Sequence, residues 1–82
     1  MTHGKRTTIK FGACAILSAH LGGRRGTSLT LEPAATVREA VARAGVPEDE
    51  VWLVAVNGLK ASWERRLEEG DEVKVFAPVG GG

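Results

Sequence analysis

The sequence predicts an α+β domain in which one helix packs on a small mixed β-sheet. Three features support this prediction: short segments that alternate polar and apolar side chains, one amphipathic helix with clear end signals, and a tight-turn signal at Asn57-Gly58. A chain of 82 residues is long enough for one domain with one modest core. The predicted order of elements is ββαββ, and we expect the first and last strands to be neighbours at the centre of the sheet.

The helix has the clearest local signals. Thr36 and Glu39 have the spacing of a capping box, in which the threonine side chain accepts a hydrogen bond from the first turn and the glutamate reaches back to the cap amide. Gly45 suits the left-handed position after a helix, and Pro47 prevents continuation. Apolar side chains recur at helical spacing, at Val37, Ala40, Val41 and Ala44. Together these signals predict a helix from about Thr36 to Ala44.

Alternation also predicts the first two strands. Thr8–Phe11 and Ser28–Glu32 alternate polar and apolar side chains, as half-buried strands do. Between them, residues 13–21 are ambiguous, because their apolar side chains fit either a short helix or a second apolar strand. The glycines of residues 22–26 then predict a loop.

A third strand is predicted where the chain is apolar on both faces. Val51–Val56 has this pattern, which is typical of a central strand covered on more than one side. We expect Trp52 to belong to the core rather than to a contact surface. Asn57-Gly58 would then turn the chain, and Leu59–Ala61 would form the short return strand.

The last strand, Glu72–Ala77, leads directly into the end of the sequence. A polar connection over Glu64–Gly70 precedes it, with Leu67 as the expected apolar anchor. Because side chains alternate along a strand, Lys74 and Phe76 would point outward while the core receives Val73, Val75 and Ala77. An outward aromatic side chain beside an apolar strand predicts that Phe76 belongs to a partner-docking patch.

Charge and composition limit the classes of partner that the sequence predicts. The net charge is +1, but residues 1–26 carry five basic residues and no acid, while the remainder carries six basic and ten acidic residues. A nucleic-acid interface needs aromatic side chains beside its basic residues, and Phe11 is the only one there. We therefore expect a solvated basic face and no nucleic-acid partner. Without a signal-peptide pattern or an apolar run long enough to span a bilayer, a cytoplasmic protein with no membrane partner is expected.

Catalytic and metal-binding motifs are not recognisable in the sequence. Cys14 is the only cysteine, so no internal disulfide can form, and we expect it to be a small buried hydrophobe. His3, Cys14 and His20 are too few and too scattered for a structural zinc site. With no plausible set of acid, base and nucleophile, the protein is predicted not to be an enzyme in its own right and to bind no metal.

The end of the sequence suggests a different kind of chemistry. Pro78 lacks an N–H and ends sheet pairing, which predicts a domain over residues 1–77 and a flexible glycine tail over residues 78–82. Glycines have no Cβ, so Gly80, Gly81 and Gly82 can lie in a slot too narrow for other residues. Activation by ATP would make the Gly82 carboxylate an acyl donor. The alternative is a frayed terminus without function.

Four segments taken together carry a resemblance to a known family. They are Thr36-Val37 at the helix start, Val54–Gly58 on the third strand, Leu67–Val73 before the last strand, and Phe76–Gly82 at the end. In this order they resemble the ubiquitin-like sulfur carrier family, which includes the molybdopterin synthase small subunit and the thiamine-biosynthesis sulfur carrier.

The resemblance implies a β-grasp fold and a carrier cycle. An E1-like adenylating enzyme would use ATP to join AMP to the Gly82 carboxylate, and sulfur from a sulfur donor protein would replace AMP to give a thiocarboxylate. An acceptor enzyme, such as a molybdopterin synthase large subunit, would then take the sulfur. The carrier would bind no cofactor itself, and Gly80 and Gly81 would keep the tail narrow. Contacts with partners would come from Phe76, Pro78 and Val79.

Two departures from the family pattern leave the pathway open. The molybdopterin branch usually has an arginine shortly after the first strand, which Phe11–Ile16 lacks, and usually has serine where Gly80 stands. Molybdopterin (molybdenum or tungsten) cofactor biosynthesis is the first expectation, and the thiamine pathway is an alternative. A protein modifier conjugated to lysines through Gly82, and a non-catalytic β-grasp binding module, also remain open.

Overall fold

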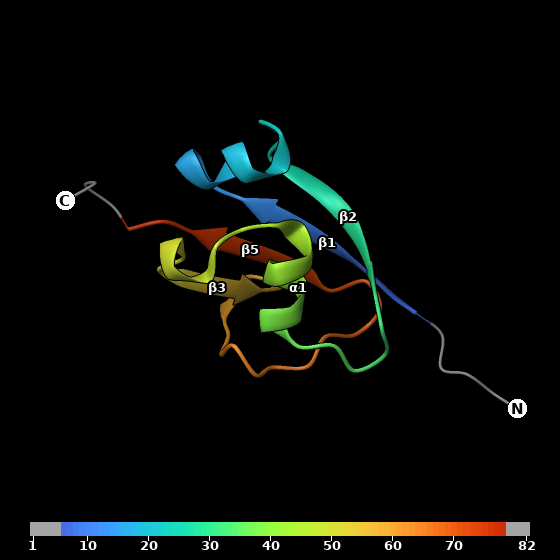
Figure 1. Cartoon of the computed structure of the whole chain (residues 1–82). Coiled ribbons are helices and arrows are strands. Elements are labelled where there is room, and N and C mark those ends of the chain that lie inside the picture. Colours follow the sequence, from blue (N-terminus) through green and yellow to red (C-terminus); the bar gives the residue numbers. More distant parts are fainter. Residues whose placement is uncertain (1–5, 79–82) are drawn as a thin grey trace, which may run out of the picture.

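The computed structural model describes residues 6–78, in which one α-helix lies across one face of a five-stranded sheet (Figure 1). Two short 3₁₀ helices, η1 and η2, complete the fold. The elements in chain order are β1 (Thr7–Ala13), η1 (Ala15–Leu21), β2 (Gly26–Leu31), α1 (Val37–Ala44), η2 (Glu48–Glu50), β3 (Leu53–Val56), β4 (Leu59–Lys60) and β5 (Glu72–Phe76). No helix in this part of the chain is both long and apolar enough to span a membrane.

The strand order across the sheet is β2-β1-β5-β3-β4. The first and last strands, β1 and β5, run parallel at its centre, and every other neighbouring pair is antiparallel. This arrangement confirms the predicted α+β class and the expected pairing of the first and last strands. A mixed sheet of this order crossed by one helix is the β-grasp fold, as the resemblance implied.

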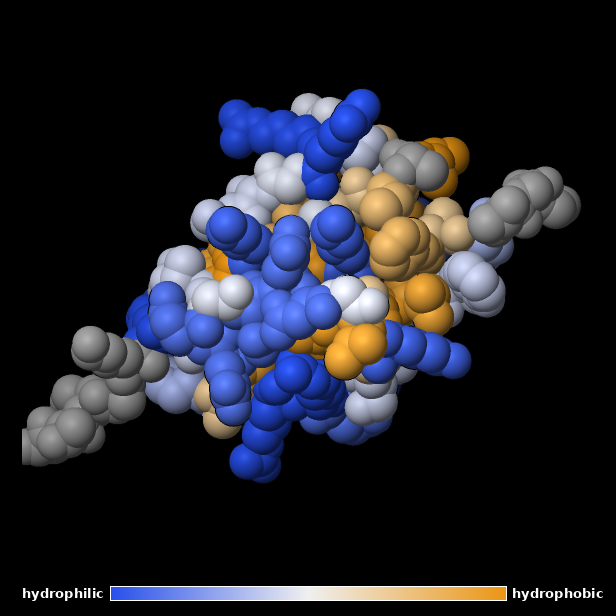
Figure 2. Space-filling view, turned by 180° about the vertical axis from the view of Figure 1, so that it is seen from behind, coloured by the Kyte–Doolittle hydropathy of each residue, from blue (hydrophilic) through white to orange (hydrophobic). Residues whose placement is uncertain are grey.

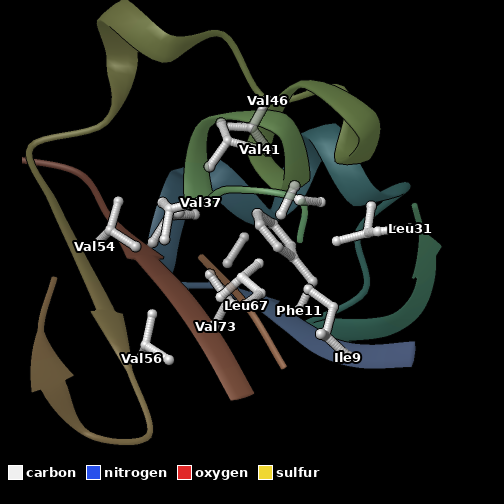
Figure 3. Close-up of a cluster of buried hydrophobic side chains, with 14 of the residues drawn as sticks. Ile9, Phe11, Leu31, Val37, Val41, Val46, Val54, Val56, Leu67 and Val73 are labelled. Carbon is white, nitrogen blue, oxygen red and sulfur yellow. The ribbon is translucent and has the colours of Figure 1, made fainter. Parts of the chain in front are cut away.

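The core lies between α1 and the inner face of the sheet (Figure 3). Phe11, which is 1% exposed, lies beneath the helix and pairs in register with Val73 of β5. Leu67 is 2% exposed, so the polar connection is anchored as predicted. Full burial of an aliphatic or aromatic side chain contributes about 1.5–3 kcal/mol. The largest fully buried side chains are Phe11, Ile9, Leu17, Val37, Val41, Val73 and Val75.

Helix α1 begins and ends where the local signals predicted. The Thr36 Oγ1 accepts a hydrogen bond from the Glu39 N–H at 3.3 Å, and the Thr36 N–H donates to Glu39 Oε1 at 2.8 Å. These two bonds form the capping box. At the other end, Gly45 has a φ of 83°, and its N–H donates to the Ala42 carbonyl. A residue with a side chain would be strained in this left-handed conformation.

Residues 15–21, within the ambiguous segment, form η1 rather than a strand. Leu17 is 1% exposed, whereas Ile16 is 76% exposed, so the segment buries one side and leaves the other at the surface. Gly22, with a φ of 69°, ends the helix. Cys14 precedes η1 and is half-buried, so the expectation that it is a buried hydrophobe is only partly met.

Strand β3 is less central than its composition suggested. It lies between β5 and the two-residue strand β4, and Leu53 and Ala55 on its outer side are half-buried. The predicted tight turn is present, because Asn57 and Gly58 have φ values of 54° and 85°. The apolar residues on both faces of β3 therefore reflect an inner face against the core and an outer face that is only partly covered.

A buried carboxylate joins the β3–β4 turn to the start of β5. Asp71 is 8% exposed; its Oδ1 accepts a bond from Asn57 Nδ2 at 2.9 Å, and its Oδ2 accepts bonds from the Glu68 N–H at 2.8 Å and Arg65 at 3.3 Å. Asn57 in turn accepts from the Glu72 N–H at 2.9 Å. Burial raises the pKa of Asp71, but these hydrogen bonds and the Arg65 charge outweigh it, so the pKa is lower than 3.8, its ordinary value.

Asp71→Asn is expected to lower the free energy of unfolding by about 1–3 kcal/mol at pH 7, because the variant loses hydrogen bonds to a charged acceptor. The lowered pKa means that the unfolded chain takes up the proton first as the pH falls. The stabilisation is therefore complete above the unfolded pKa and is lost as the pH falls through the lower folded pKa. Urea unfolding between pH 7 and pH 2 should show that the free energies of unfolding of the wild type and the variant become equal in acid. Asp49→Asn, at an exposed carboxylate, is the control and should match the wild type.

Thr36→Ala is expected to lower the free energy of unfolding by about 1 kcal/mol, because it removes the acceptor for the Glu39 N–H. Thr36→Ser keeps a hydroxyl at the same place and is the matched control. Urea unfolding of both variants measures the difference. Equal losses in the two variants would show that the methyl group, not the cap, matters at this position.

Candidate functional site

The predicted tail begins at the end of the central strand β5. Both edges of β5 are paired, with β1 and β3, and Val73 and Val75 are fully buried. After Phe76, Ala77 is half-buried and packs against the core, and Pro78 is exposed. The start of the tail is therefore held in one place by the body. The predicted tail and partner residues Val79, Gly80, Gly81 and Gly82 lie outside the described residues.

Phe76 lies on the outer face of the sheet, opposite α1. It pairs with Leu53 of β3, and on its other side the Cys14 N–H donates to the Val75 carbonyl at 3.1 Å, which continues β1 by one residue. Alternation places Cys14, Leu53 and Phe76 on the same face, and all three are half-buried. The predicted outward direction of Phe76 is confirmed, and it belongs to a row of three apolar side chains across the base of the tail.

Two further apolar side chains are exposed at the same end of the sheet. Ile16 is 76% exposed on η1, which contacts both β1 and β5. Trp52 is 63% exposed, and its N–H donates to the Phe76 carbonyl at 2.8 Å. The prediction that Trp52 belongs to the core is wrong. Val51 packs against the core just before β3, and the next residue is left at the surface.

We refer to Cys14, Ile16, Trp52, Leu53 and Phe76 as the tail-exit surface. Figure 2 looks onto the outer face of the sheet and shows apolar residues gathered on one side of it, with hydrophilic side chains over most of the rest. Contiguous exposed apolar surface of this kind marks interaction sites in monomeric proteins.

The two short helices hold this surface in place. Leu17 fixes η1 in the core, which keeps the neighbouring Ile16 directed outward. His20 Nε2 lies 2.7 Å from Glu50 Oε1, so a side-chain contact joins η1 to η2 just before Trp52. The exposed apolar side chains are therefore presented by ordered backbone.

Sequence reasoning identified Phe76 but missed Cys14, Ile16 and Leu53. Alternation continued from Phe11 past Ala13 would have placed Cys14 on the outer face. The meeting of these residues depends on the pairing of β1, β5 and β3, which are far apart in the sequence.

The chemistry available at this site is binding and presentation. Apart from the Cys14 thiol, the tail-exit surface has no titratable side chain. Within residues 6–78, no group of His, Cys, Asp and Glu side chains could hold a metal ion.

Comparison with known proteins places the chain among small ubiquitin-like proteins. Haloferax volcanii SAMP1 is 26% identical, with a TM-score of 0.74, over 92% of this chain and 99% of that chain. A Pyrococcus furiosus protein provisionally named molybdopterin converting factor, subunit 1, is 30% identical, with a TM-score of 0.72, over 89% and 99%. Ubiquitin from Caldiarchaeum subterraneum, 20% identical with a TM-score of 0.61 over 94% and 99%, shares the fold.

No curated protein sequence matches the chain. A family profile described as Mut7-C ubiquitin matches residues 8–79, which is most of the sequence and includes every strand except the first residue of β1. Together with the likeness to the Pyrococcus furiosus protein, this match shows that the chain belongs to the Mut7-C ubiquitin family of small ubiquitin-like proteins.

Proposed function

We propose that this protein is a sulfur carrier whose Gly82 carboxylate is adenylated by an E1-like enzyme and converted to a thiocarboxylate. The observation that carries the proposal is the tail-exit surface, a set of apolar side chains at the end of the central strand β5, from which the proposed glycine tail would leave. The body supplies a docking surface and a fixed origin for the tail, while the partner enzymes supply the reactive groups and ATP.

The length of the tail limits where a partner's active site can lie. Four residues follow Pro78, and four fully extended residues span at most about 14 Å. The reacting carboxylate must therefore lie within that distance of the docked body. Contact with the tail-exit surface would place the body correctly, and the narrow glycines would enter the active site.

The chemical steps follow from the poor reactivity of a carboxylate. Transfer of AMP from ATP to the Gly82 oxygen makes that oxygen a good leaving group, and pyrophosphate departs. Hydrosulfide released by a sulfur donor protein then attacks the acyl carbon: the C–S bond forms as the C–O bond to AMP breaks, AMP leaves, and the thiocarboxylate remains. An acceptor enzyme takes the sulfur in the last step. The likeness to the Pyrococcus furiosus protein supports a role in molybdopterin synthesis. In this proposal the pathway is molybdenum or tungsten cofactor synthesis in the cytoplasm, and the acceptor is a molybdopterin synthase large subunit.

A second candidate function is protein modification, which is favoured by the likeness to Haloferax volcanii SAMP1, the small archaeal modifier protein 1. The first step would be the same, but the activated Gly82 would be transferred to a lysine amine of another protein. Recovery of Gly82 in an isopeptide bond from cell extract would support this function, whereas recovery of the thiocarboxylate alone would support the carrier.

Incubation with an E1-like adenylating enzyme, ATP and a sulfur source is expected to raise the intact mass by about 16 Da, the exchange of one oxygen for sulfur at an activated acyl group. Deletion of Gly81 and Gly82 should abolish the gain in mass while leaving thermal unfolding unchanged, because Ala77 is the last described residue that packs against the core. An unchanged mass in wild-type protein, under conditions that load a known carrier, would contradict the proposal.

Ile16→Ser is expected to weaken binding to the adenylating enzyme by about tenfold, because burial of one apolar anchor at an interface contributes more than about 1 kcal/mol. Leu59→Ser is the matched control: Leu59 is 74% exposed, close to the 76% of Ile16, but lies on β4 after the Asn57-Gly58 turn. The KM for the carrier in ATP–pyrophosphate exchange measures the effect. Equal KM values for the two variants would exclude the tail-exit surface as the docking site.

A further inference from the structure

A hollow of about 400 Å³ lies on the outer face of the sheet, next to the tail-exit surface. Its floor is a cross-strand pair of glycines, Gly12 of β1 and Gly26 of β2, which lie opposite each other in the register. Charged and polar residues from three strands and the loop before β2 line the hollow around this floor; those directed to the outer face are Lys10, Arg25, Ser28, Glu72 and Lys74.

The two glycines form the floor of the hollow, and the close approach of neighbouring backbone also favours glycine at both positions. Neither Gly12 nor Gly26 has a positive φ, so a residue with a side chain could adopt either conformation. A Cβ on Gly12 would lie 3.4 Å from the Arg25 carbonyl oxygen and 3.5 Å from Lys74 Cγ. A Cβ on Gly26 would lie 3.3 Å from the Phe11 carbonyl oxygen. Any larger side chain at these positions would fill the space between the cations.

The charge around the hollow is positive. Lys10, Arg25 and Lys74 are exposed, and within residues 6–78 none of the three forms an ion pair. Glu72 is the one acidic side chain of the lining, so three cations oppose one anion. Cations gathered around a concave surface attract an anionic group.

We propose that this hollow accepts a carboxylate side chain from the partner protein that docks on the tail-exit surface. Lys74 and Phe76 are two residues apart on the same face of β5, so the cations and the apolar surface form one continuous area. A partner that covers Phe76 with an apolar group would place an adjacent aspartate or glutamate over Gly12. This inference rests on the proposed function for the docking event and adds the chemistry of the partner: an apolar anchor next to an acidic residue.

A nucleic acid is a poorer match for the same surface. Glu72 would repel one of a series of phosphates, and a strand of bases needs several exposed aromatic platforms. Phe76, the aromatic side chain nearest Lys74 along β5, is half-buried. A single carboxylate of a folded partner meets the three cations without any need for aromatic platforms.

The test is a ¹⁵N NMR titration of the full chain with the blocked peptide acetyl-Gly-Asp-Glu-Gly-amide, at low ionic strength. Its uncharged counterpart, acetyl-Gly-Asn-Gln-Gly-amide, inorganic phosphate and an octauridine RNA are titrated in parallel. We expect saturable shifts of the Gly12 and Gly26 amides with the acidic peptide, weakened by added salt. Equal shifts with the uncharged peptide, stronger shifts with phosphate or RNA, or no saturable shift would overturn the proposal.

Three variants separate a built hollow from diffuse attraction. Lys74→Gln is expected to lower the affinity for the acidic peptide about fivefold, which is the effect of losing one exposed ion pair. Gly12→Thr keeps every charge but fills the floor of the hollow, and it should lower the affinity for the acidic peptide at least as much. Arg43→Gln removes an exposed cation on α1 and should change nothing. If Gly12→Thr does not fold, the comparison of Lys74→Gln with Arg43→Gln still tests the proposal. Equal effects of these two substitutions on peptide affinity would contradict a carboxylate site in the hollow.

This experiment is independent of sulfur loading. If the thiocarboxylate assay fails while the peptide still binds, the proposed carrier function is refuted and the proposed carboxylate site stands. If the peptide does not bind while sulfur loading is normal, the proposed site is refuted and the carrier function stands.

Discussion

The parallel pairing of β1 with β5 is the contact on which the rest of the structure depends. It joins the first and last strands at the centre of the sheet and brings Phe11 beside Val73 under α1. β2 and β3 add to the outer edges of this pair, and the helix covers its inner face. Because β5 is held on both sides, the residues that follow it leave the body from a fixed point. The proposed docking and presentation of Gly82 both require that fixed point.

Much of the fold could be predicted because its signals are local. The capping box at Thr36 and the turn at Asn57 involve residues close together in the sequence, and both appear as expected. Residues 15–21 and Trp52 could not be placed in the same way. Whether an apolar side chain is buried depends on what another segment places over it, and Trp52 is 63% exposed although its neighbour Val51 packs against the core.

The candidate site also divides into residues predicted from local signals and residues placed by contacts between distant segments. Phe76 was identified because alternation along one strand determines its direction. Ile16 and Leu53 join it only through pairing between β1, β5 and β3, and the hollow needs Gly12 and Gly26 to meet across two strands. In the sequence these glycines are indistinguishable from turn or loop residues. Side chains from segments distant in the chain therefore make up most of the surface that a partner would meet.

The central place of β5 also has a consequence for biosynthesis. A nascent chain that lacks this strand would leave β1 and β3 with unpaired edges and an open core, a state that is prone to aggregate or to be degraded. The sheet can close only after β5 has left the ribosome, because the first strand pairs with the last. Copies that reach the folded state have thus been translated through β5, so selection for folding also removes molecules truncated before the point where the proposed tail begins.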